Sequence, residues 1–216
     1  MLPALDNNEV RVLGCLIEKS IVTPDLYPLT LNALTNACNQ KSARNPVMAL
    51  QPGEVQHTIR VLEAKHLVRT EENFKSRAEK YSQRFCNTRY SDLHFDPAEL
   101  AIVCLLMLRG PQTPGELRSR SGRLHEFADN AEVVDTLTRL IDREAGPLVV
   151  ELPRTPGRKD PEYTHLFAGE IDIQAYESQA RSASASGSTG RVSVADLAER
   201  VSQLEAEVAA LKARLQ

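Results

Sequence analysis

The sequence lacks any apolar run long enough to cross a lipid bilayer as a helix. Its richest apolar stretch, residues 101–108, is far shorter than the roughly 20 residues that a spanning helix needs. The N-terminal segment reaches polar residues at positions 6–9, so it also lacks the apolar core of a signal peptide. We therefore expect a cytoplasmic protein without a membrane partner.

Paired cysteines and catalytic motifs are also missing. Cys15, Cys38, Cys86 and Cys104 form no CxxC pair, which is atypical of disulfide-rich domains and of zinc sites. No GxSxG, P-loop, GxGxxG or HExxH motif is present, and the five histidines are scattered. We expect buried free thiols, no cofactor, no metal and no enzymatic activity.

Basic residues do not outnumber acidic residues in the whole chain, but they are concentrated in one region. The chain has a net charge of −3, which argues against a uniformly basic nucleic-acid binder. Residues 39–90, however, contain 10 basic and 5 acidic side chains, whereas residues 96–168 contain 9 and 12. If the protein meets a polyanion, we expect residues 39–90 to make the contact.

The sequence contains an internal duplication. Residues 6–24 align with residues 96–114 at an offset of 90, and residues 54–65 align with residues 132–143 at an offset of 78. The difference between the two offsets indicates an insertion of 12 residues in the first copy, around residues 39–51. Two copies are too few for a solenoid, so two related domains, residues 1–92 and 93–169, are the simpler interpretation.

Each copy predicts three helices followed by a β-hairpin. The apolar periodicity and the N-cap signals Asp96 and Thr113 support this order. In the first copy, Val55, Ile59, Leu62 and His66 should face inward from the third helix. The predicted helices cover residues 7–20, 52–66, 97–109 and 130–143, with a further helix starting at Thr30 and another at Thr113; the strands cover residues 67–70, 80–85, 148–152 and 162–167. This order is the winged-helix plan, so we expect a mainly helical α+β protein with two tandem winged-helix domains.

The C-terminal segment predicts a dimerising coiled coil after a flexible Ser/Ala/Gly linker at residues 170–191. Over residues 192–216 the apolar positions alternate at spacings of three and four, with valine mostly at a and leucine at d, a pattern that favours a parallel two-stranded coil. A helix that folds back on its own domain is the alternative. The predicted dimer contacts are Val194, Leu197, Val201, Leu204, Val208, Leu211 and Leu215.

Four segments give the chain a resemblance to a known family. Residues 23–47 (TPDLYPLTLNALTNACNQKSARNPV), 83–87 (QRFCN), 108–118 (LRGPQTPGELR) and 163–167 (YTHLF) resemble the signature of the bacterial YceH family. The resemblance covers about residues 2–169. It implies tandem winged-helix domains in a family of uncharacterised function.

The sequence is compatible with two functions. The first is binding of double-stranded DNA by a dimeric transcriptional regulator, in which the third helix of the first copy reads base edges and the loops and wing contact phosphates. The candidate contacts are Lys41, Arg44, Gln56, His57, Arg60, Lys75, Arg77 and Lys80. The second is a non-catalytic scaffold that binds a protein partner, which suits the acidic second copy. Nearby glutamates such as Glu54 and Glu63 weaken the first hypothesis, because phosphates repel them.

Overall fold

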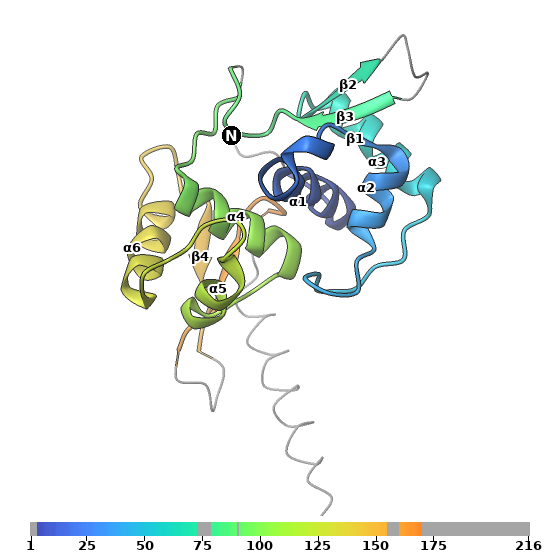
Figure 1. Ribbon diagram of the computed structural model, residues 1–216. Coiled ribbons are helices and arrows are strands. Elements are labelled where there is room, and N and C mark those ends of the chain that lie inside the picture. The colour runs from blue at the N-terminus through green and yellow to red at the C-terminus, as the bar shows by residue number, and fades with distance from the viewer. Residues whose placement is uncertain (1–3, 73–78, 90, 155–159, 170–216) are drawn as a thin grey trace, which may run out of the picture. The chain divides into compact units, whose positions relative to one another are not determined.

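Three helices followed by an antiparallel pair of strands occur in both repeats (Figure 1). The computed structural model describes residues 4–72, 79–89, 91–154 and 160–169. The first repeat contains α1 (Asn7–Val22), the 3-10 turn η1 (Pro24–Leu26), β1 (Leu29–Thr30), α2 (Leu31–Cys38), α3 (Pro52–Ala64), β2 (Val68–Glu72) and β3 (Glu79–Gln83). The second contains α4 (Pro97–Arg109), α5 (Pro114–Ser121), α6 (Asn130–Ile141), β4 (Val149–Glu151) and β5 (Tyr163–His165). The predicted α+β class and the helix–helix–helix–hairpin order are confirmed.

Capping residues explain where the helices begin. Asp96 and Glu99 form a reciprocal capping box at the start of α4, and Thr113 and Glu116 form another at the start of α5. Each box satisfies backbone N–H groups that have no partner within the helix. Both N-cap predictions are therefore confirmed.

The first repeat carries a strand that the sequence pattern did not predict. Strand β1 pairs with β3, with Leu29 opposite Tyr81, and β3 pairs with β2 in the order β1-β3-β2. In the second repeat Gln112 makes the corresponding bridge to Tyr163 beside the β4–β5 hairpin. Two residues are too few to show an alternating pattern, so only the tertiary pairing reveals this strand.

Equivalent residues make equivalent hydrogen bonds in the two repeats. Lys65 Nζ donates to the carbonyl of Ala4, and Arg143 Nη1 donates to that of His94. Ala4 and His94 differ by the 90 residues of the first alignment, and Lys65 and Arg143 by the 78 of the second. The duplication inferred from the sequence therefore has a counterpart in the contacts.

The repeats pack on each other through equivalent positions. Cys104 Sγ in α4 lies 3.7 Å from the carbonyl oxygen of Gly14 in α1, and these residues are 90 positions apart. Phe85 and Phe167, each two residues beyond the last strand of its repeat, make an edge-to-face contact at 5.0 Å. Such self-complementary contacts are those of a pseudo-twofold interface. The apolar interior is continuous across it, and the described residues of both repeats belong to one compact unit.

One predicted core position is wrong. Val55, Ile59 and Leu62 are buried as expected, but His66 is exposed. Helix α3 ends at Ala64, and His66 has a left-handed backbone with φ of 60°, which turns its side chain off the helical stripe.

The state of the cysteines and the length of the helices agree with the sequence. All four cysteines are free and buried. None of the described helices is both long and apolar enough to traverse a bilayer. Lys75, Arg77, the linker and the seven predicted coil contacts lie outside the described residues.

Candidate nucleic-acid interface

Helix α3 presents a polar face to solvent because its apolar side chains are buried on the opposite side. Val55, Ile59 and Leu62 point into the core, where they are 1% exposed or less. The intervening positions therefore turn outward: His57 and Arg60 are exposed and Gln56 is half-buried. These three side chains occupy one surface of a helix whose start is fixed by a capping box between Gln51 and Glu54.

The side chains of His57 and Arg60 are not engaged by the fold. Neither makes a hydrogen bond or an ion pair with the part of the chain that the structure describes. An exposed side chain without a hydrogen bond or an ion pair is available to an external ligand. The helix therefore offers a donor set of the type that can contact base edges and phosphates.

The β2–β3 hairpin lies beside α3. The Thr70 hydroxyl of β2 donates to Glu63 of α3 and joins the two elements. Burial and the neighbouring Glu79 raise the pKa of Tyr81 on β3. Lys80 lies opposite Glu71 in the strand register.

Arg69 is a candidate that the sequence pattern missed. Val68 is buried and Arg69 is exposed, so the alternation of β2 turns Arg69 outward. Its register partner is Ser82, and the next pair along the same face is Glu71 with Lys80. The alternation of strand residues could have identified Arg69, because opposite pairs two residues apart lie on one face.

Arg44 is not a surface contact, so its assignment to the DNA interface is wrong. Its side chain is fully buried, and its Nη1 and Nη2 atoms donate to the carboxylate of Glu18 at 3.0 and 2.6 Å. Its Nε donates to the carbonyl of Ala37. Burial alone would raise the pKa of Glu18, but the hydrogen bonds and charge of Arg44 outweigh burial and lower it. Arg44 therefore anchors the inserted loop to α1.

A second buried guanidinium fixes the same loop. Arg11 of α1 donates to the carbonyls of Cys38 and Pro46, at 3.0 and 2.7 Å. Asn39 closes the loop by exchanging two hydrogen bonds of 2.8 Å with the backbone of Leu50. The signal in the sequence was an arginine inside an apolar helical stretch, since such a residue must find partners when buried. The inserted loop at residues 39–51 is therefore held in place by hydrogen bonds within the fold.

Lys41 remains at the surface but lines a different feature. It is exposed and contributes to a basic pocket between α1, the inserted loop, α4 and α5. Lys41 is thus grouped with Arg109 and Arg123, not with the side chains of α3.

The second repeat does not offer the same face. At the offset of 78, Gln56 corresponds to Val134, His57 to Asp135 and Arg60 to Thr138. Val134 is 41% exposed, and Arg139 of the same helix is held by Asp96, Glu99 and Asp135. An acidic and partly apolar helix face is unsuited to a phosphate backbone.

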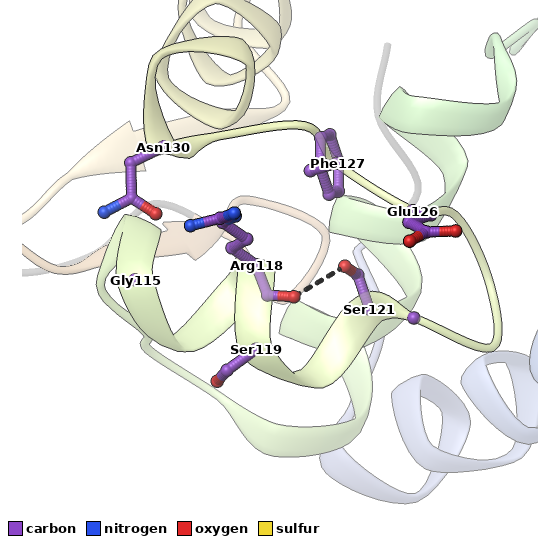
Figure 2. Close-up of a pocket in the computed structure, with 8 residues that line it drawn as sticks. Gly115, Arg118, Ser119, Ser121, Glu126, Phe127 and Asn130 are labelled. Carbon is purple, nitrogen blue, oxygen red and sulfur yellow. Dashed lines mark hydrogen bonds between the residues drawn. The ribbon is translucent and has the colours of Figure 1, made fainter.

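A surface pocket of about 630 Å³ lies between α5 and the start of α6 (Figure 2). Arg118 extends from α5 toward Asn130, and Glu126 and Phe127 border the pocket. The Arg118 guanidinium already donates to the carbonyl of Ala128, and Ser121 donates to the carbonyl of Arg118. The side chains of Arg118 and Ser121 are thus already engaged within the fold.

Burial keeps two of the four cysteines, Cys86 and Cys104, in the protonated thiol form. No cluster of three or more metal-ligating side chains occurs in the described part of the chain. Burial raises the pKa of Cys86 to about 12 and raises that of Cys104 as well. A thiol with a raised pKa stays protonated and is a poor nucleophile.

Known proteins match the chain along almost its whole length. The sequence model described as a protein of unknown function, DUF480, matches residues 5–158. A UPF0502 protein of Vibrio atlanticus is 49% identical over 204 residues, which cover 94% of this chain and 90% of the relative. UPF0502 protein YceH of Salmonella typhimurium is 50% identical over 211 residues, which cover 98% and 94%. The chain therefore belongs to the UPF0502 (YceH) family, as the resemblance of its signature segments implied.

Proposed function

We propose that the protein is a DNA-binding regulator of transcription that contacts double-stranded DNA through α3 and the β2–β3 hairpin of its first repeat. The observation that carries the proposal is the outward face of α3, where Gln56, His57 and Arg60 are free of the core. Glutamine and arginine can make paired hydrogen bonds to adenine and guanine edges in the major groove. Lys80 and Arg69, on the hairpin face turned away from α3, would supply charge for phosphates farther along the duplex.

The asymmetry of the repeats supports this assignment. Both repeats have the same helix order, but the outward positions of the third helix are Gln, His and Arg in one and Val, Asp and Thr in the other. A common structural need would retain similar residue types at these exposed positions in both copies. The difference is the one expected if the first repeat contacts a polyanion and the second does not.

The proposal includes a dimer and a cytoplasmic location. The heptads of residues 192–216 would join two chains, and two copies of the α3 surface would then occupy two half-sites of a pseudopalindromic site. In this role the protein needs no catalytic group and no cofactor.

The test is binding of fluorescent duplex DNA from a pool of genomic fragments, measured by polarisation across a salt series. We expect affinity to fall steeply as salt rises, because phosphate contacts release counterions. Arg60→Ala should lower affinity for an enriched sequence by about 1–3 kcal/mol and should reduce its preference over random DNA. Lys80→Ala should weaken both kinds of DNA alike and flatten the salt dependence by about one unit of slope.

Arg154→Ala is the matched control, because Arg154 is an exposed arginine on the hairpin of the second repeat. It should leave binding to the enriched sequence close to that of the unchanged protein. Absence of binding at low salt, or an equal loss in Arg60→Ala and Arg154→Ala, would contradict the proposal.

One observation favours a second function, a scaffold for a protein partner. Val134 is 41% exposed on α6 and lies beside Asp135, so this helix presents an apolar residue on an acidic face. That combination suits contact with a basic, partly apolar protein surface better than contact with DNA. Affinity purification with and without Val134→Asp would then identify partners lost specifically from this face.

A further inference from the structure

A pocket of about 480 Å³ lies where the two repeats meet. Its walls come from the C-terminal end of α1, the inserted loop, the C-terminal end of α4, and α5 with the residues that follow it. Leu105 and Leu108 of α4 form part of its apolar floor and are 5% and 1% exposed. Pockets that hold small molecules have volumes of about 300–1,000 Å³ and largely apolar walls, so this one is of suitable size.

The charge of the pocket is strongly unbalanced. Its lining includes five cationic side chains, Lys19, Lys41, Arg109, Arg120 and Arg123, and one carboxylate, that of Glu18. That carboxylate is already engaged by Lys19 and by the buried Arg44. The acid in the lining therefore does not neutralise the cations around it.

Three of the five cations lack an ion-pair partner in the part of the chain that the structure describes. Arg120 is held by Gln112 and Glu116. Lys41, Arg109 and Arg123 form no ion pair with any residue among those described. Like charges that converge in a concave site without counter-charges cost stability, and an anionic ligand would remove that cost.

Arg109 is the most constrained of the pocket cations. Its Nε atom is buried and has no hydrogen-bond partner among the described residues. Burial lowers the pKa of Arg109, and the positive charges of Arg120 and Arg44 lower it further. Buried polar atoms are almost always satisfied in native proteins, so the fold only partly satisfies the guanidinium of this pocket-lining arginine.

From this geometry we propose that the pocket binds a small phosphate-bearing molecule, with Lys41, Arg109 and Arg123 contacting the phosphate oxygens and the leucine floor contacting the rest of the ligand. Phosphate groups carry multiple charges and several strong acceptors, and arginine forms paired hydrogen bonds with them. Because both repeats line the pocket, a bound ligand would also bridge them.

This site is independent of the proposed DNA interface. It involves none of Gln56, His57, Arg60 or Lys80, and binding of a small anion is measured without DNA. Failure of one proposal therefore leaves the other standing.

The test is isothermal titration of inorganic pyrophosphate into the full chain at about 0.15 M salt, where exposed charges are substantially screened. We expect a dissociation constant of about 1 mM or lower. Lys41→Gln and Arg123→Gln remove exposed side chains that support no packing, and each should weaken binding by roughly 2- to 5-fold. Arg109→Gln should weaken it by about tenfold or more, because its guanidinium is partly buried.

Arg154→Gln removes the same charge outside the pocket and should not change pyrophosphate affinity. If Arg109→Gln fails to fold, the double variant Lys41→Gln/Arg123→Gln carries the test by itself. Absence of pyrophosphate binding, or an equal loss in Arg154→Gln, overturns the proposal. It is also overturned if the double variant weakens duplex DNA binding while pyrophosphate does not bind, because the pocket would then belong to a DNA surface.

Discussion

Gly14 offers the sharpest test of the packing between the repeats. It lies in the middle of α1 and faces α4. A Cβ atom at this position would lie 2.9 Å from Leu108 Cδ2, 3.1 Å from Leu108 Cγ and 3.3 Å from Met107 Cβ. Leu108 and Met107 are 1% and 4% exposed, so both neighbours are buried side chains of the apolar interior.

Two opposing effects decide the stability of Gly14→Ala. Alanine favours a helix interior over glycine by about 1 kcal/mol. An extra methyl group in a closely packed core costs about 1–3 kcal/mol, because side chains or backbone must shift. Since the new contact involves Cβ and Cγ atoms as well as a terminal methyl, we expect overpacking to dominate and the free energy of unfolding to fall by about 1–2 kcal/mol.

Urea denaturation followed by circular dichroism measures this change. Gly53→Ala is the matched control, because Gly53 lies in α3 with nothing within 4 Å of the added Cβ, and it should stabilise by about 0.4–1 kcal/mol. In a Leu108→Ala background the clash disappears, so Gly14→Ala should become neutral or stabilising. If Gly14→Ala is as stable as Gly53→Ala in the unchanged background, the inferred α1–α4 contact is incorrect.

Three further predictions test charge and assembly. Burial lowers the pKa of His165 to about 4, below the roughly 6.5 of an unfolded chain, so the unfolded state binds more protons between these values. Stability should therefore fall by about 1.5–2 kcal/mol from pH 7.5 to pH 5, and His165→Gln should lose this part of the pH dependence; an unchanged slope would contradict it. Arg44→Met should destabilise by about 3–5 kcal/mol in denaturant titrations, because it leaves the carboxylate of Glu18 without its main partner. Lys41→Met, at an exposed site, should change stability by less than about 0.5 kcal/mol, and equal effects of the two would refute the buried pair. Deletion of residues 192–216 should reduce the dimer population in light scattering, and identical masses with and without the segment would exclude the coil as a dimer contact.

The helices and the repeat could be predicted because their signals are local. An N-cap residue acts on a backbone N–H group two or three positions away, and an apolar stripe repeats within one helix. Asp96 and Thr113 therefore identified helix starts, and Val55, Ile59 and Leu62 identified a buried face, without knowledge of any neighbour. The same locality made the duplication visible as aligned stripes and caps.

The tertiary structure alone decided which charges are available. Arg44 and Lys41 are three residues apart in one loop and look alike in the sequence, yet one is buried on Glu18, 26 residues earlier, and the other is exposed. Strand β1, the contact of Gly14 with α4 and the basic pocket likewise depend on segments that are distant in the chain. The sequence also specifies these features, but the residues that form them come together only when the chain folds. The burial and pairing of a charge depend on the atoms that surround it in space, not on its neighbours in the chain.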